Sequence, residues 1–479
     1  MRRTVPLVLL LAWLLLLPGC EGKGGKTGDT VPDPAPESAA PASPAPTEEP
    51  ERVSAAGSYG DVAAALKRAW SREDSAAAVP LALGQEAADT VALEGDILYL
   101  IQGGAVLICR GGGGEFSVLG WIRVGEDWQE RRQENGWQGR EKQPVALCAL
   151  RGRLAVISLV SDYGYTVEEE GRWLFRDNSR CVVELFDTED PENPVPMATY
   201  GQSGVPGCAL VRDGRLYVAT RRQLFAEEFP EWGDMSALPA LFTGEEQRTL
   251  KWEEMDILRD GSSWYTLLAV YSPYNGTRLE SRALLGGGER MIMDREGLAL
   301  LGEETGEMAA YSFAEETLDC AVAPLPGGSA GELCAAALRG EDWRTYGGGA
   351  AEDDWHAPWD DTRTLSLHRT ESGLYVELHE GKEALCHMTV GYDFQAAPEQ
   401  GRGIYIDAAD GLLILPSEDG WAVWRLEEGE FRHVRSLYSP DQSENRRVFL
   451  WGGSIYAVDS RRVYALNAAG PTLLGEWVL

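Results

Sequence analysis

The sequence predicts an all-β fold, a β-propeller of six to eight blades preceded by a short N-terminal helix. After about residue 88, short runs rich in Val, Leu, Ile and Tyr alternate with glycine-containing turns, a pattern typical of strands. The runs share a signature of turn, glycine and strand, as in "EGDILYLI" (94–101), "DGRLYVA" (213–219) and "GGSIYAV" (452–458). The signature recurs about every 40–60 residues without βαβ alternation, which favours radial blades over a sandwich.

The stretch "SYGDVAAALKRAW" at 58–70 predicts the helix before the first strands. Ser58 can cap its N-terminus, and Asp61 three residues later completes a capping box. The apolar residues that share one helical face are Val62, Leu66, Ala69 and Trp70. We expect this face to pack on the following domain.

Two pieces of the repeat can be assigned within a blade. In "VVELFDTEDPENPVPMATYG" (182–201) we expect two antiparallel strands, joined by a turn in which Asp187 and Asp190 bond backbone amides. The stretches "CALRGRLAVI" and "CALVRDGRLYVA" align from Cys148 and Cys208. The alignment predicts that these two cysteines occupy equivalent places in neighbouring blades and stay reduced, because such places lie too far apart for a disulfide.

The first residues indicate export. A basic "MRR" precedes the apolar run "VPLVLLLAWLLLL", too short to span a bilayer. The run ends in "LPGC", which resembles the lipobox of bacterial lipoproteins. The resemblance implies a lipoprotein signal peptide over 1–19, lipid attachment at Cys20, and an extracytoplasmic protein anchored to a bacterial cell membrane. An ordinary secretory signal peptide stays open as the alternative.

Composition divides the rest of the chain. Residues 20–57 are rich in Pro, Ala and Gly and predict a disordered linker, and 58–479 would hold the helix and the propeller. The net charge of -33 argues against a nucleic-acid partner. It favours solubility outside the cell, with attraction for cations as the alternative.

The cysteines and histidines predict no metal site. Seven cysteines remain after Cys20, an odd number, and none forms C-x-x-C. Each lies beside apolar residues, so we expect buried thiols. The five histidines are scattered without metal-ligand spacing.

At these residues the chain resembles exported bacterial and archaeal proteins whose C-terminal β-propeller is related to WD-repeat propellers. "EAADTVALEGDILYLI" keeps Ala88, Asp89, Val91, Gly95 and Tyr99 of that family's opening segment, and "VVELFDTEDPENP" matches a later strand and turn. The likeness is good over 58–220 and looser beyond. The resemblance implies an architecture and supplies no catalytic residues.

Two polar segments carry tryptophans that we single out as candidate partner-binding residues. They are "GEDWQERRQENGWQGREK" (125–142), with Trp128 and Trp137, and "AEDDWHAPWDD" (351–361), with Trp355 and Trp359. Exposed tryptophans on loops are enriched in recognition sites. Packing back on the propeller is the competing interpretation. The acidic residues of 351–361 could gather Ca²⁺, but their spacing is not that of a calcium loop, so no metal is expected.

The sequence contains no nucleophile elbow, P-loop, HExxH or dinucleotide fingerprint, so we expect no catalytic residue and no cofactor. A quinoprotein-like blade motif occurs once, at 453–470. We therefore expect a monomeric, non-catalytic binding or scaffolding module at the cell envelope, with an envelope protein or glycan as its partner. An envelope hydrolase, lyase or quinoprotein-like enzyme stays open, as does a cation-binding protein.

Overall fold

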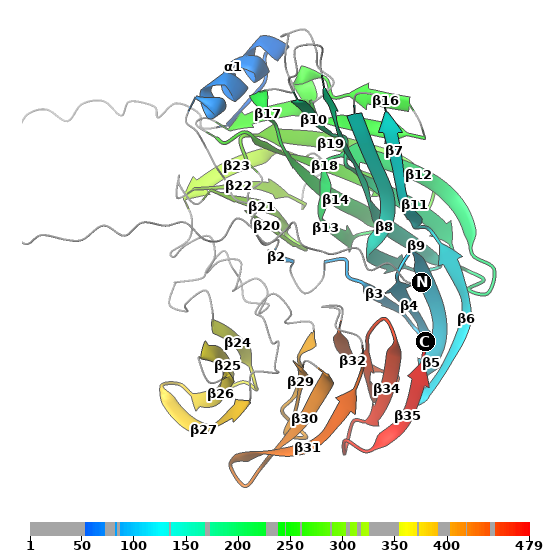
Figure 1. Cartoon of the computed structure of the whole chain (residues 1–479). Helices are drawn as coiled ribbons and strands as arrows, with labels where there is room; N and C mark the ends of the chain where they lie inside the picture. Colours follow the sequence, from blue (N-terminus) through cyan, green and yellow to red (C-terminus); the bar gives the residue numbers. More distant parts are fainter. Residues whose placement is uncertain are drawn as a thin grey trace, which may run out of the picture. The chain divides into compact units, whose positions relative to one another are not determined.

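The computed structural model describes residues 53–71, 82–83, 87–133, 136–167, 173–226, 238–244, 246–258, 261–287, 290–302, 307–313, 318–324, 354–370, 373–390, 403–417, 419–440 and 446–479. All of them belong to one compact unit, Glu51–Leu479. They form seven sheets that follow one another along the chain (Figure 1). The all-β propeller expected from the sequence is confirmed, with seven blades among the described residues.

The first two blades contain the residues of the candidate functional site. Blade 1 is a four-stranded meander of β3 (Val91–Glu94), β4 (Ile97–Gln102), β5 (Ala105–Gly112) and β6 (Glu115–Arg123). Blade 2 is built on β8 (Gly136–Leu150), β9 (Arg153–Val167), β11 (Arg180–Asp187) and β12 (Val195–Ser203). Further strands extend it: β7 (Glu126–Gln133), β10 (Trp173–Asp177), β15 (Ala240–Thr243) and β16 (Glu246–Thr249).

Blades 3 and 4 each recruit a strand from the N-terminal region. Blade 3 orders β13 (Val205–Arg212), β14 (Arg215–Gln223), β18 (Trp264–Ser272), β19 (Thr277–Leu285), β17 (Met255–Leu258) and β1 (Val53–Ala55), with a 3₁₀ turn at Trp252–Glu254. Blade 4 comprises β20 (Arg290–Asp294), β21 (Gly297–Gly302), β22 (Glu307–Ser312) and β23 (Cys320–Pro324), with β2 (Ala82–Leu83) parallel to β20.

The last three blades are four-stranded meanders. Blade 5 holds β24 (Asp354–Pro358), β25 (Arg363–Thr370), β26 (Gly373–Glu380) and β27 (Glu383–Val390). Blade 6 holds β28 (Tyr405–Asp407), β29 (Leu412–Ser417), β30 (Gly420–Glu427) and β31 (Glu430–Tyr438). Blade 7 holds β32 (Arg447–Trp451), β33 (Ser454–Val458), β34 (Arg462–Asn467) and β35 (Leu473–Val478).

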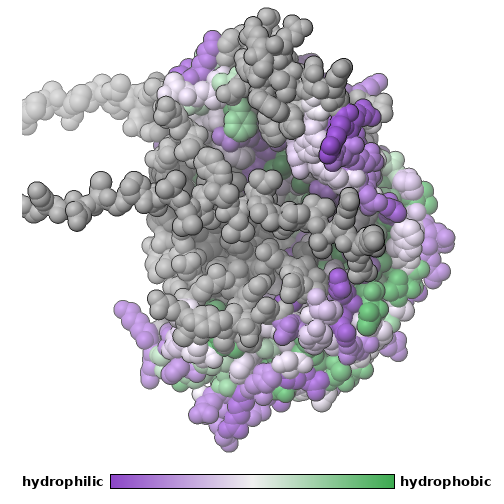
Figure 2. Space-filling view, viewed as in Figure 1, coloured by the Kyte–Doolittle hydropathy of each residue, from purple (hydrophilic) through white to green (hydrophobic). Residues whose placement is uncertain are grey.

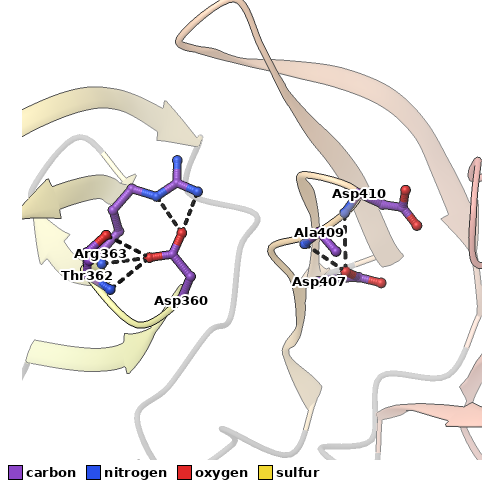
Figure 3. Close-up of polar contacts among 6 residues, drawn as sticks. All are labelled: Asp360, Thr362, Arg363, Asp407, Ala409 and Asp410. Atoms are coloured by element: carbon purple, nitrogen blue, oxygen red, sulfur yellow. Dashed lines mark hydrogen bonds and ion pairs between the residues drawn. The ribbon is translucent and has the colours of Figure 1, made fainter.

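The glycine signature marks the second strand of six blades and the third strand of blade 5. It begins β4, β9, β14, β21, β29 and β33, where the chain turns from the first strand to a largely buried second strand, and in blade 5 it begins β26. Asp294, Asp360 and Asp407 fix the turn between the first and second strands of blades 4 to 6, because in each the Oδ1 atom accepts from the backbone amides two and three residues on. Figure 3 shows the pattern at Asp360 and Asp407.

Other sequence expectations are confirmed at the level of single strands. The turn between β11 and β12 is bonded as predicted: the Glu189 amide donates to Asp187 (3.0 Å) and the Glu192 amide to Asp190 (3.1 Å). Cys148 lies on the first strand of blade 2 and Cys208 on the first strand of blade 3, and both are buried.

The N-terminal helix α1 (Tyr59–Trp70) is capped by Ser58, whose hydroxyl accepts from the Asp61 amide. Val62 and Leu66 join the hydrophobic core shared by blades 2 and 3, and the Trp70 indole donates to Leu224 O (2.8 Å).

The linker boundary needs a correction. Residues Val53–Ala55, inside the stretch predicted as disordered linker, form β1 and pair with β17. The next residue, Ala56, is buried and its amide donates to Met255 O (2.9 Å). The pairing is possible because Val53 and Ala56 are apolar at the end of a polar segment. Residues 1–52 lie outside the described residues.

Blade 7 packs directly on blade 1 and closes the ring without exchanging a strand. The Trp451 indole donates to Gly95 O (2.9 Å). The buried Tyr456 hydroxyl donates to Glu115 O (2.7 Å) and accepts from the amides of Gly112 (3.2 Å) and Gly114 (3.1 Å).

A second link joins the ends of the propeller. Arg447 makes two hydrogen bonds to Asp89, at 2.6 and 2.7 Å, in the paired geometry that suits a carboxylate. Asp89 also forms a backbone bridge with Leu147 of blade 2. The aspartate of the family-like opening segment is therefore a structural residue that joins blades 2 and 7.

Candidate binding groove

The four tryptophans singled out from the sequence lie in different environments. Trp359 is buried, only 3% exposed, in the core shared by blades 5 and 6, and its ring meets Phe431 edge-on at 5.7 Å. It cannot anchor a partner at the surface, which corrects the expectation. Trp359 directly follows β24 and keeps the alternation of a strand, since Ala357 and Trp359 are buried and Pro358 between them is exposed. Trp355 lies on β24, and its side chain is outside the described part of the structure.

The segment 125–142 presents its tryptophans differently. Trp128 is 41% exposed on β7, and Trp137 is half-buried on β8. Both lie next to a groove between β6 of blade 1 and β7 and β8 of blade 2, which we call the β6–β7 groove. Its volume is about 400 Å³, and its lining consists of Gln102, Gly103, Gly104, Ala105, Trp121, Arg123, Gly125, Glu126, Asp127, Trp128, Glu141, Lys142 and Gln143.

Trp121, which lines the groove from β6, was not singled out from the sequence. It is 62% exposed on β6, the outer strand of blade 1. A signal was present in "GWIRV": Ile122 and Val124 are buried, so strand alternation places Trp121 and Arg123 on the solvent face. Along the right-hand margin of Figure 2, where Figure 1 places β6 and β12, hydrophobic and hydrophilic surface alternate.

Two glycines set the spacing between the walls of the groove. The amides of Val124 (3.1 Å) and Gly125 (2.7 Å) both donate to Gly104 O, which fixes the corner where β6 leads into β7. A Cβ atom on Gly125 would lie 2.5 Å from Gly104 Cα. Only glycine permits this backbone approach, and the approach places Trp121 and Trp128 on either side of one corner.

A cluster of aromatic rings supports Trp128. Its ring centroid lies 5.8 Å from that of Trp137 and 5.7 Å from that of Tyr163, and the last two are 5.6 Å apart. The Trp128 ring lies directly over Gly139, where a Cβ atom would approach it to 2.1 Å. Because three strands and a glycine hold this cluster, the exposed face of Trp128 is preorganised.

The charged groups of the groove are largely paired. Arg123 contacts Asp127 at 3.4 Å, Lys142 contacts Glu184 at 2.8 Å, and Gln143 donates to Glu141 at 3.2 Å. Lys142 is 9% exposed, and its ion pair with Glu184 joins β8 to β11 within blade 2.

Beyond the groove on β7, the hydrogen bond from Arg132 to Glu130 (2.6 Å) holds the pKa of this carboxyl below its ordinary value. Because the charged groups of the groove are largely paired, its lining offers hydrogen-bonding groups without a strong excess of positive or negative charge.

The acidic segment 351–361 does not assemble a metal site in its described part. The Asp360 carboxylate accepts from the Thr362 and Arg363 amides and forms an ion pair with the Arg363 guanidinium, and these bonds hold its pKa far below the ordinary value (Figure 3). His356 bonds the Ser366 hydroxyl at 2.6 Å. Among the described residues, no group of three or more His, Cys, Asp or Glu side chains is placed to hold a metal ion. Asp353 lies outside those residues.

No protein-family model matches the chain, and no curated protein sequence matches it. Among solved structures, a chain of the mitotic checkpoint complex is 10% identical over 91% of this chain and 97% of its own, with a TM-score of 0.31. Citrobacter koseri AztD is 12% identical over 81% and 93%, with a TM-score of 0.29. Saccharomyces cerevisiae Sqt1 is 8% identical over 83% and 87%, with a TM-score of 0.31.

These likenesses are too low to carry an argument about function. The propeller fold rests on the seven sheets themselves, and membership of the exported propeller family stays a prediction. None of the helices in the described ranges has the length and apolar character needed to cross a membrane.

Proposed function

We propose that this chain is a lipid-anchored, extracytoplasmic propeller that holds a component of the cell envelope in the β6–β7 groove. The observation that carries the proposal is the pair of exposed tryptophans, Trp121 and Trp128, which line one groove from β6 of blade 1 and β7 of blade 2. Exposed indoles on a rigid frame are what recognition sites provide. The paired charges around them suit a role in binding rather than in proton transfer.

The anchor is proposed from the "LPGC" stretch that ends at Cys20. In cells we expect Cys20→Ala to release the chain from membranes or to leave an uncleaved precursor. Membrane retention with normal processing in this variant would contradict the anchor. The result does not bear on the groove.

The groove is tested with the full Cys20→Ala chain, so that no lipid contributes to sedimentation. We expect this chain to cosediment with isolated envelope fragments, and Trp121→Ala to weaken the association about tenfold or more if the indole is an anchor residue. Tyr274→Ala is a matched control, because Tyr274 is 49% exposed on the hairpin between β18 and β19 of blade 3. Equal binding by the Trp121 and Tyr274 variants would refute the proposal.

A further inference from the structure

We infer that the ligand of the β6–β7 groove is an uncharged glycan, an inference that rests on the binding function proposed above. Sugars present flat apolar faces bordered by hydroxyl groups. A site for them combines aromatic surfaces with side chains that both donate and accept hydrogen bonds. The groove has both, in a fixed arrangement.

The aromatic surfaces are Trp121 and Trp128. Trp121 exposes 62% of its surface, and Trp128 exposes a face whose other side lies on Gly139. The two residues come from different blades, yet the Gly104–Gly125 corner fixes their separation. The rings therefore need little ordering when a sugar stacks on them, which lowers the entropic cost of binding.

The polar groups that line the groove beside the two indoles match the hydroxyl groups of a sugar better than they match a charged ligand. Asp127 and Glu141 accept, Gln143 does both, and Arg123 donates. Arg123 is already paired with Asp127, and Lys142 with Glu184. An anionic ligand would meet the carboxylates of Glu126, Asp127 and Glu141, and a cationic one would compete with Arg123 for its partner. A neutral ligand with many hydroxyls bonds these groups without disrupting a pair.

The size of the groove also favours a glycan over a folded protein. Its volume of about 400 Å³ lies within the range of about 300–1,000 Å³ that is usual for small-ligand sites. A stable protein interface needs roughly 800 Å² on each partner, a requirement that a groove between two strands does not meet by itself. A groove of this volume, lined by two indoles, suits a short stretch of glycan chain.

The test uses the full Cys20→Ala chain and three preparations of envelope fragments: untreated, digested with protease, and oxidised with periodate, which cleaves vicinal diols of sugars. We expect binding to survive the protease and to fall about tenfold or more after periodate. We expect Trp121→Ala to remove the periodate-sensitive binding, and Trp121→Tyr, which keeps an aromatic face, to restore most of it. Tyr274→Ala should behave as the unsubstituted chain.

The outcomes separate the two proposals. Binding that protease abolishes and periodate spares identifies a protein partner, overturns the glycan and leaves the binding function standing. If untreated fragments bind the chain, any other combination of sensitivity to protease and periodate also overturns the proposal of a glycan ligand. If untreated fragments do not bind, the proposed function fails as well. Far-ultraviolet circular dichroism of each variant confirms that it has folded.

Discussion

Replacing Tyr456 with phenylalanine tests how the propeller is closed. The Tyr456 side chain is fully buried, and its hydroxyl makes the three bonds that tie β33 of blade 7 to the β5–β6 turn of blade 1. Phenylalanine keeps the ring and its contacts with Trp451, whose centroid lies 4.9 Å away. The substitution therefore removes the hydrogen bonds and leaves the packing.

The expected loss follows from those three bonds. Each intramolecular hydrogen bond contributes about 1 kcal/mol net, so the upper value is about 3 kcal/mol. Gly112 and Gly114 are half-buried, so water recovers part of the loss. We therefore expect the free energy of opening the seam to fall by about 2 kcal/mol, which is about a 30-fold change in the opening equilibrium.

Native-state hydrogen exchange is the appropriate measurement, because opening of the seam is local. A loss of about 2 kcal/mol moves the melting temperature of a chain this long by only about 2 °C. We expect amides in β5, β6, β32 and β33 to exchange about 30-fold faster and those in β25 and β26 to be unchanged. Tyr438→Phe, at an exposed tyrosine of β31, is the control. Unchanged exchange at the seam would refute the role of the hydroxyl.

Three further predictions concern the Gly104–Gly125 corner, the order in which two cysteine thiols react, and the buried carboxyl of Asp256. Gly125→Ala should cost about 1–3 kcal/mol in urea unfolding and weaken envelope binding, because its Cβ atom would strike Gly104. A thiol reagent should label Cys386 in the native chain before Cys109, whose pKa burial raises to about 12; faster labelling of Cys109 would contradict the placement. Burial raises the pKa of Asp256 in the folded chain. The free energy of unfolding, compared with that of Asp256→Asn, should therefore be greatest below the ordinary pKa of aspartate and should fall as the pH rises through the raised pKa of the folded state. Urea unfolding at each pH measures this difference.

The fold could be predicted from the sequence because its repeats contain turns whose residue types can be recognised. The glycine before the second strand of six blades and the acidic turn after β11 depend only on residues close together in the chain. The signature does not always mark the same strand, because "SGLYVEL" (372–378) becomes β26, the third strand of blade 5, and "RGIYID" (402–407) becomes β28, the first strand of blade 6. The number of blades could therefore be predicted only as a range.

The candidate site was only half predictable. Trp128 and Trp137 stood out within a polar segment, but the groove also needs Trp121, which belongs to a different blade. The arrangement of Trp121 and Trp128 depends on the Gly104–Gly125 contact, a tertiary feature that strand periodicity does not encode. Trp359 was misplaced for the opposite reason. Its neighbours are acidic, yet the strand next to it turns the indole into the core between blades 5 and 6.

Blade 1 connects the ring closure to the groove. Its β5–β6 turn is bonded to Tyr456 of blade 7, and its β4–β5 turn contributes Gln102 and Gly104 to the groove. Gln102 also donates to Ser460 O of blade 7 at 2.9 Å, so this one residue contacts blade 7 and lines the groove. A blade bonded on both sides cannot shift relative to blade 2 without breaking one of these contacts. The bonds between blades 7 and 1 therefore limit the movement of Trp121 relative to Trp128, and such rigidity is what a preorganised stacking site requires.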